Sequence, residues 1–263
     1  MTYVEINGVA PGIEALHRAA TMILGHFTTM QVRGGAVAGF DLHLERLRQG
    51  SAELFPGAEP AGDDTIRALI AHALRGEPDA TVRVTVLSAA DVMVSVLEPG
   101  ADTPPPPIRA RTIVYERELP HLKHRATLGL FHHAAEARRA GFDDVVFTGR
   151  DGFLREGSVW NLVLWDGARV VWPDAPMLAG VTMRLLRGEL GAAGVPQISR
   201  ALTTADLSGM TGAAAVNSRF PARPISSVDD VAFPGTGALT EVLENAWCRV
   251  ARQDIQGPVP DTP

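Results

Sequence analysis

Lys123 is the only lysine among the 24 lysine and arginine residues of the chain. An arginine can replace a lysine as a surface charge but not as a nucleophile, because a guanidinium keeps its proton in a protein while a desolvated amine can lose one. A neutral lysine amine forms Schiff bases with carbonyl compounds. The alternative explanation is an arginine-rich composition that retained one lysine by chance, so the surrounding residues must decide between the two.

Two histidines, His121 and His124, flank this lysine. They could lower the pKa of the amine, or they could simply form hydrogen bonds with the connecting segment. They lie too close along the chain to specify a metal site without further ligands, so the sequence predicts no metal site.

Glu156 is the second candidate for chemistry. The segment 155–161 lies between two predicted strands, so we expect a loop, and Gly157 would let its backbone approach a ligand closely. A carboxylate in such a loop could pair with the protonated pyridine nitrogen of pyridoxal phosphate (PLP) and keep the ring an electron sink. The alternative is an exposed glutamate in a turn.

Three further segments offer groups that bind phosphate. Gly180, Val181 and Thr182 open a predicted helix, whose free N–H groups attract anions. Asn217 and Ser218 follow a strand of small residues and present short polar side chains. Arg46 lies on a predicted helix, where it could hold a phosphate with two hydrogen bonds or be an ordinary solvated charge.

Alternating and helical hydrophobic patterns place these residues on an α+β scaffold. In the first half of the chain, strands are predicted at 3–6, 27–32, 37–40, 80–87, 92–98 and 108–115, with helices from Asp41 (as N-cap) to 55 and over 65–74. In the second half, helices are predicted at 124–140, 182–190 and 239–252, and strands at 145–147, 161–165, 169–172 and 213–216. The spacing in the first half indicates mostly antiparallel pairing.

The composition is that of a globular protein, with 46% hydrophobic and 21% charged residues. A net charge of −6 argues against nucleic-acid and anionic-membrane partners, which need a concentrated basic surface. Cys248 is the single cysteine, and we expect it to pack within the C-terminal helix of a protein from a reducing compartment. No signal peptide or membrane-length apolar segment is recognisable, so the sequence predicts a soluble cytoplasmic protein.

Taken in order, the candidate residues resemble those of the class IV aminotransferases, the fold-type IV PLP enzymes. The most specific stretch runs from Gly141 through the Asp151-Gly152 turn to Glu156 and Asn161. The phrases His43-Leu44-Glu45-Arg46-Leu47 and Leu178-Ala179-Gly180-Val181-Thr182 are also in the form and order of this family. The resemblance extends from Glu5 to the region of Ser226, nearly the whole chain.

The resemblance implies a two-domain α+β enzyme with PLP in the interdomain cleft. A small N-terminal α/β sandwich is expected over residues 1–116, a linker over 117–122, and a larger β-barrel-like domain with helices over 123–255. Residues 256–263 are expected to be a disordered tail. The family also implies a homodimer.

The resemblance also implies a role for each matching residue. Lys123 would form the Schiff base with PLP and then carry the proton between the substrate carbon and the cofactor, while Glu156 would hold the pyridine nitrogen. The phosphate would be anchored by Arg46, Gly180, Val181, Thr182, Asn217 and Ser218.

The sequence motifs constrain the choice of reaction within the family less than they constrain the family itself. Leu128 stands where branched-chain transaminases have a tyrosine, and the Arg-x-His carboxylate trap of D-amino acid transaminases is not recognisable. Phe27-Thr28-Thr29 and Leu122-Lys123-His124 are instead similar to the 4-amino-4-deoxychorismate lyases. Because most of the family transfers amino groups, we expect a transaminase acting on a small amino acid and a 2-oxo acid, with the lyase as the alternative.

A third possibility is a degenerate member that binds a ligand without catalysis, although retention of Lys123 and Glu156 argues against it. The substrate carboxylate requires arginine, histidine or backbone N–H groups, because the chain has no second lysine. The candidate substrate contacts are His26, Thr28, Arg125 and Asn161, with Arg33 and Arg219 as further cationic candidates.

Overall fold

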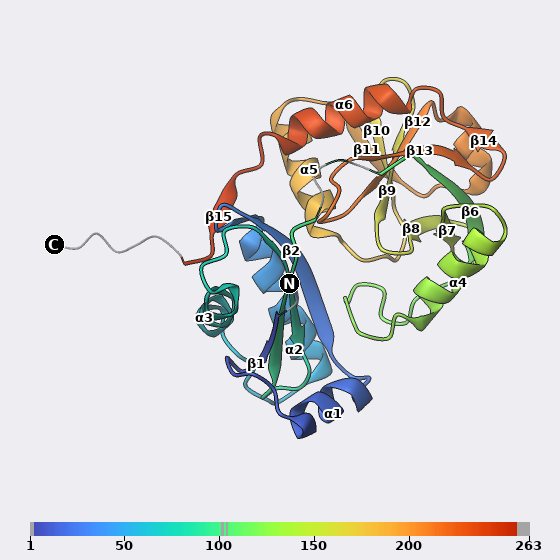
Figure 1. Cartoon of the computed structure of the whole chain (residues 1–263). Coiled ribbons are helices and arrows are strands. Elements are labelled where there is room, and N and C mark those ends of the chain that lie inside the picture. The colour runs from blue at the N-terminus through green and yellow to red at the C-terminus, as the bar shows by residue number, and fades with distance from the viewer. Residues whose placement is uncertain (1–2, 101–102, 104, 257–263) are drawn as a thin grey trace. The chain divides into compact units, whose positions relative to one another are not determined.

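The computed structural model describes residues 3–100, 103 and 105–256, which form two compact units (Figure 1). The first unit contains the described residues within 1–101, 122–126 and 251–263, and the second those within 102–121 and 127–250. Lys123 therefore belongs to the first unit, and Glu156 to the second. Of the predicted tail 256–263, only Gln256 lies within the described residues.

The first unit is built on a six-stranded antiparallel sheet in the order β1-β5-β4-β2-β3-β15. Its strands are β1 (Tyr3–Ile6), β2 (His26–Arg33), β3 (Ala36–Ala38), β4 (Ala80–Val86), β5 (Val92–Leu97) and β15 (Arg252–Asp254). Three helices accompany them: α1 (Ile13–Thr21), α2 (Phe40–Leu54) and α3 (Asp63–Leu74). The predicted strands and the two predicted helices of this part are confirmed within a few residues.

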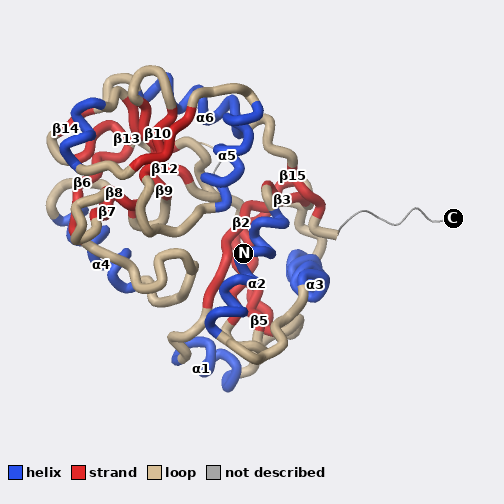
Figure 2. Tube along the Cα trace, turned by 180° about the vertical axis from the view of Figure 1, so that it is seen from behind, coloured by secondary structure: helices blue, strands red, loops and turns tan. Residues whose placement is uncertain are grey.

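Buried and half-buried residues alternate along β2 and β4, and this pattern shows which face of the sheet the helices cover. Met30, Val32, Val82 and Val84 are fully buried in one cluster with apolar residues of α2 and α3, so both helices pack on the same face of the sheet (Figure 2). The residues between them, such as Arg83, are only half-buried. This is the α/β sandwich that the family resemblance implies.

The second unit contains a closed six-stranded barrel. Its strands β9-β12-β13-β6-β7-β8 pair in this order, and β8 pairs back to β9 and closes the ring. The bounds are β6 (Ile108–Val114), β7 (Asp144–Thr148), β8 (Leu154–Gly157), β9 (Asn161–Trp165), β12 (Gly212–Val216) and β13 (Arg223–Val228). Strands β10 (Val170–Pro173), β11 (Gln197–Arg200) and β14 (Val231–Ala232) extend the sheet beyond the ring.

Period-two alternation separates the two sides of the barrel wall. Leu162 and Leu164 of β9 belong to one core cluster, while Val163 between them joins a second cluster under α5 (Val181–Ala192) and α6 (Thr236–Trp247). Helix α4 (Leu128–Arg139) packs through Leu130 against β7. A short 3-10 helix, η1 (Thr204–Gly209), completes the unit.

Several predicted element ends are wrong. Helix α2 begins at Phe40 after Gly39, whose left-handed backbone (φ 64°, ψ 44°) favours glycine, so Asp41 is in the first turn and is not the N-cap. Residues 154–157 form strand β8, so Glu156 lies on a strand and not in a loop. The predicted helix 124–140 begins only at Leu128, because backbone hydrogen bonds to β2 keep residues 123–125 extended.

The C-terminal helix also differs from the prediction, since α6 ends at Trp247 and the chain continues into β15. Cys248 is the C-cap of that helix and is exposed, so its predicted packing role is wrong. Helix α1 is absent from the prediction altogether. Among the described residues, none of the helices has the length and apolarity to cross a membrane.

Candidate active site

Lys123 is fixed to the beginning of β2 by backbone hydrogen bonds. The Phe27 N–H donates to the Lys123 carbonyl (2.9 Å), and the Arg125 N–H donates to the Gly25 carbonyl (3.0 Å). Between them, His26 and His124 form an antiparallel bridge. The half-buried lysine lies with its Nζ 5.0 Å from the centroid of the Phe27 ring. Its position therefore depends on the sheet and not on a flexible linker.

A buried hydrogen bond joins β2 to α2 near this amine. Thr28 Oγ1 and His43 Nδ1 are 2.6 Å apart, and both side chains are almost fully buried. Burial, together with the smaller effects of the positive charges of Arg46 and Lys123, lowers the pKa of His43 to about 3. His43 is therefore a neutral imidazole at physiological pH. We call Lys123, Phe27, Thr28, His43 and Arg46 the lysine cluster.

His26, a predicted substrate contact, is 1% exposed, and its Nε2 lies 3.0 Å from Ser51 Oγ. Burial lowers its pKa to about 4. Its ring packs on α2 where Gly50 has no side chain, since a Cβ there would lie 2.6 Å from the ring. In this structure His26 joins β2 to α2.

Arg125, another predicted substrate contact of this unit, donates to backbone carbonyls. Its guanidinium binds Met22 O and Ala19 O, both at 2.7 Å, at the end of α1. Arg33 likewise donates to Val32 O and Gly100 O. Both guanidinium groups are thus hydrogen-bonded to backbone carbonyls.

In the second unit, Glu156 and Asn161 face each other as Cα partners across the β8–β9 hairpin. Gly157 N donates to Trp160 O to close this turn, and a Cβ on Gly157 would collide with the Trp160 ring. The sequence spacing of these two residues is therefore that of a tight hairpin. It brings an acidic and an amide side chain to the same end of the barrel.

Glu156 is buried, and its carboxylate accepts a hydrogen bond from Arg117 Nη1 at 3.0 Å. The side chains of the pair are only 9% and 7% exposed, respectively. Burial of an ion pair costs desolvation energy, and the attraction between Arg117 and Glu156 offsets part of this cost. Arg117, within the predicted linker, was not among the predicted site residues.

Asn161 connects this hairpin to the N-terminus of α5. Its Nδ2 donates to Leu178 O at 2.8 Å, and a Cβ on Gly180 would collide with its Oδ1. Gly180 is the N-cap of α5, followed by the buried residues Val181 and Thr182. The first turn contains no acidic side chain, so its N–H groups and dipole favour an anion.

Asn217 and Ser218 follow β12, which pairs with β9 so that Val216 is opposite Asn161. The Asn217 side chain accepts hydrogen bonds from the N–H groups of Arg219 and Phe220, and its Nδ2 donates weakly to Val159 O (3.4 Å). These contacts shape the turn after β12. We call Glu156, Asn161, Gly180, Val181, Thr182, Asn217 and Ser218 the glutamate cluster.

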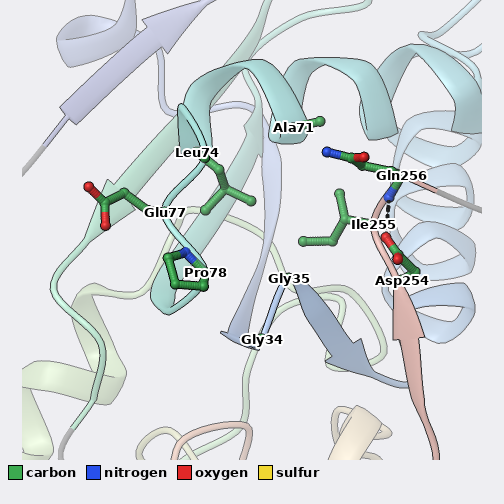
Figure 3. A pocket seen from close by; sticks show the side chains of 10 residues that line it. Gly34, Gly35, Ala71, Leu74, Glu77, Pro78, Asp254, Ile255 and Gln256 are labelled. Atoms are coloured by element: carbon green, nitrogen blue, oxygen red, sulfur yellow. Dashed lines mark hydrogen bonds between the residues drawn. The ribbon is translucent and has the colours of Figure 1, made fainter.

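A separate surface pocket of about 270 Å³ lies in the first unit, where Ile255 and Leu74 point toward each other (Figure 3). None of the predicted site residues lines it. Its walls come from the β2–β3 turn, the end of α3 and the end of β15.

Comparison with known proteins identifies the family. The model of amino-transferase class IV matches residues 25–228, more than three quarters of the chain, which therefore belongs to the class IV aminotransferases. This family comprises PLP-dependent transaminases and lyases.

One curated relative is the bifunctional aminodeoxychorismate lyase / D-amino acid transaminase of Mycobacterium tuberculosis. It is 28% identical, with 86% of this chain and 90% of the relative covered. Two solved structures share the fold. They are the branched-chain aminotransferase of Thermoproteus uzoniensis with norvaline (TM-score 0.81, 19% identity, 93% of each chain) and a hypothetical aminotransferase of M. tuberculosis in its PLP-bound form (TM-score 0.77, 23% identity, 93% of this chain and 98% of that one).

The residues of the two clusters fit PLP on chemical grounds. Glu156 is a buried carboxylate, the helix end at Gly180 leaves no room for a side chain, and Lys123 is an amine beside a neutral histidine. Sequence reasoning missed His43, although it lies three residues before Arg46 on the same helix, a spacing that places both on neighbouring turns.

Proposed function

We propose that the protein is a PLP-dependent aminotransferase that transfers an amino group between a small amino acid and a 2-oxo acid. Lys123 carries this proposal, because the chain's only lysine is held by β2 within a cluster of neutral and cationic groups. A nearby cation favours the neutral form of an amine, which is the nucleophilic form.

The glutamate cluster would hold the rest of the cofactor. Glu156, which is paired with Arg117, would accept a hydrogen bond from the pyridine nitrogen. The N–H groups of Val181 and Thr182, with Arg46, Asn217 and Ser218, would bind the phosphate. When bound, PLP supplies an electron sink for the carbanion that forms at the substrate carbon.

Lys123 then has a second task, as the base that moves a proton. Its Nζ would accept the proton from the substrate α-carbon and donate it again later in the reaction, which makes Lys123 both the general base and the general acid. Thr28 and His43 would fix the surroundings of the amine, and His43 would not compete for this proton, because its pKa is lowered to about 3.

Aminodeoxychorismate lyase activity is the second candidate. The name of the M. tuberculosis relative includes both this lyase and a D-amino acid transaminase. In the lyase reaction the same residues would bind the cofactor, but pyruvate would leave the substrate and 4-aminobenzoate would remain.

The two activities are separated by incubating the PLP-loaded protein with a panel of L- and D-amino acids. We expect an amino acid to convert the cofactor to its aminated form, and a 2-oxo acid to reverse this. A parallel reaction with aminodeoxychorismate is assayed for pyruvate and 4-aminobenzoate. Formation of 4-aminobenzoate with no amino acid converting the cofactor would overturn the transaminase proposal in favour of the lyase.

A further inference from the structure

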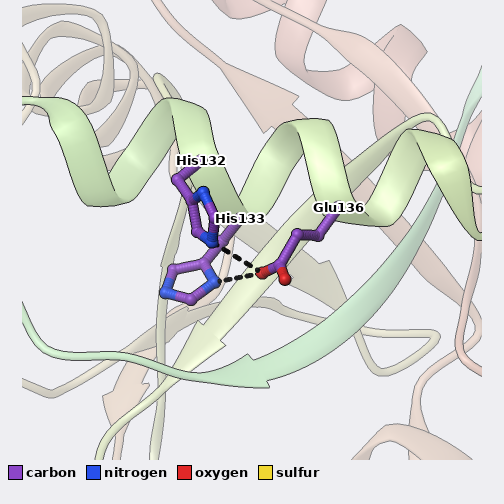
Figure 4. Close-up of side chains that lie close together, drawn as sticks. All are labelled: His132, His133 and Glu136. Carbon is purple, nitrogen blue, oxygen red and sulfur yellow. Dashed lines mark hydrogen bonds and ion pairs between the residues drawn. The ribbon is translucent and has the colours of Figure 1, made fainter.

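Helix α4 carries a group of three potential metal ligands, His132, His133 and Glu136 (Figure 4). One ligand atom from each lies within 4.8 Å of the others. These residues lie outside both the lysine cluster and the glutamate cluster. Sequence analysis predicted no metal site, and nothing in the amino-transfer chemistry requires one.

The spacing places both imidazoles on the glutamate. His132 precedes Glu136 by four residues and His133 by three, the two separations that bring side chains together on one side of a helix. His132 Nε2 lies 3.4 Å from Glu136 Oε2, and His133 Nδ1 lies 2.9 Å from the same oxygen. Figure 4 shows both rings turned toward the carboxylate.

These distances suit a tetrahedral metal ion. With Zn–N and Zn–O bonds of about 2.0–2.1 Å, neighbouring ligands of a tetrahedral zinc lie about 3.3 Å apart. The two observed histidine–glutamate separations fall on either side of this value, and the ligand atoms of the two imidazoles lie within 4.8 Å of each other. Two imidazoles and a carboxylate form a donor set that favours zinc, nickel or copper over magnesium.

The surroundings hold one of these ligands in place and leave the others accessible. The His133 ring packs on Tyr115 and Phe147, with centroid distances of 5.0 and 6.2 Å. Tyr115 itself lies against Gly129 of α4, where any Cβ would collide with its ring. The side chains of His132 and Glu136 are 56% and 43% exposed, which provides a path for a hydrated ion.

We propose that His132, His133 and Glu136 form a binding site for a divalent transition-metal ion, with zinc as the best match. His132 Nε2, His133 Nδ1 and a Glu136 oxygen supply three ligands, and water supplies the fourth. Because the site is exposed and lies near the positive charge of Arg139, we expect micromolar affinity. The bound ion would cross-link consecutive turns of α4 and stabilise the helix.

The test is calorimetric titration of the full chain with ZnCl₂ after chelator treatment. All variants carry Cys248→Ser, because an exposed thiol can bind zinc and would add a second signal. We expect one saturable site per chain, weakened by more than about tenfold in Glu136→Gln and abolished in His132→Gln/His133→Gln. His17→Gln, which removes an exposed histidine of α1, should retain the affinity, and MgCl₂ should give no binding.

Thermal unfolding provides a second readout. ZnCl₂ should raise the Tm of the Cys248→Ser protein and of the His17→Gln control, but not that of the double histidine variant. Undiminished zinc binding by the double variant would overturn the proposal. The absence of saturable micromolar binding in the Cys248→Ser protein would overturn it as well.

Discussion

Lys123 owes its position to backbone contacts. The hydrogen bonds between residues 123–125 and the start of β2 fix its Cα, and the Phe27 ring lies beside its amine. Nearby, Thr28 and His43 form a buried pair that contributes no charge. The chemistry of the amine therefore depends on neighbours that the fold of the first unit supplies.

The close packing of Gly180 against Asn161 leads to a prediction about PLP affinity. In Gly180→Ala the new Cβ would collide with Asn161 Oδ1 and disturb the bond from Asn161 to Leu178. Loss of one such buried contact costs about 1–3 kcal/mol, so we expect PLP affinity to fall by roughly tenfold or more. The measurement is absorbance titration of the apoprotein with PLP.

Gly188→Ala is the matched control, because Gly188 also lies on α5 and a Cβ there meets nothing within 4 Å. It should leave PLP affinity unchanged and stabilise the helix slightly. Equal PLP affinity in the two alanine variants would contradict the role assigned to Gly180.

The buried histidines predict how stability depends on pH. The pKa of His43 falls from 6.5 to about 3 on folding, so below pH 6.5 the unfolded chain binds a proton that the folded chain does not. This contribution to stability is present in full above pH 6.5 and is lost as the pH falls toward 3, by up to about 1.4 kcal/mol per pH unit. His26 acts in the same direction between pH 6.5 and about 4.

Urea unfolding at pH 7 and pH 5 measures this effect. Wild type should lose stability between the two, and His43→Gln should lose less, because it has one titrating group fewer. His17→Gln, with its exposed ring, should behave as wild type. Identical pH dependence in wild type and His43→Gln would show that His43 is not held neutral by the fold.

At the level of elements, the sequence predicted most strands because their hydrophobic pattern follows from their burial. The hairpin of β4 and β5 is an example, whereas in the barrel β8 was expected to be a loop and β13 was not predicted. Prediction of secondary structure failed where tertiary contacts override the preference of the local sequence for a helix or a strand. Residues 124–127 have a helical pattern, yet backbone pairing with β2 keeps residues 124 and 125 out of the helix. The helix therefore begins only at Leu128.

The candidate site likewise combines residues that the sequence predicts with contacts that only the tertiary structure reveals. Lys123 and Glu156 were predicted as site residues, Lys123 because it is the only lysine of the chain and Glu156 because its place in the order of residues resembles the family. Arg117, the partner of Glu156, is 39 residues away along the chain, so no local pattern indicates the pair. The carbonyl contacts of Arg125 with the end of α1 were missed for a related reason, since α1 itself was not predicted.

The burial of Ile255, the residue after β15, leads to a prediction about the stability of the first unit. Ile255 is 1% exposed and belongs to the core of the first unit, although it lies beyond the last helix of the chain. Ile255→Ala should destabilise this unit by about 2–5 kcal/mol, since it removes buried methyl groups and leaves a cavity. Hydrogen exchange should show faster opening of β3 and α3, with β9 unchanged.

Arg252→Ala is the control for Ile255→Ala, because Arg252 is an exposed residue of β15, three positions before Ile255. We expect it to leave exchange in β3 and α3 within experimental error of wild type. Equal protection in Ile255→Ala and Arg252→Ala would mean that the end of the chain does not stabilise the first unit.

At the scale of the whole molecule, we propose a homodimer, as the family implies. Several large apolar side chains of the first unit are exposed, among them Ile13 (87%), Ile23 (75%) and Leu24 (53%), and such groups are common at protein interfaces. Light scattering should give twice the 28.0 kDa mass of the chain. A mass of one chain at micromolar concentration would contradict this proposal.

Covalent trapping of the cofactor tests the central claim most directly. The PLP-loaded protein is reduced with borohydride and digested, and the modified peptide is identified by mass spectrometry, with Lys123→Arg as the charge-preserving control. We predict that wild type loses its visible absorption band and carries the pyridoxyl group on Lys123, whereas Lys123→Arg folds normally and is not labelled. A wild-type protein without the label, or a labelled Lys123→Arg variant, would contradict the account.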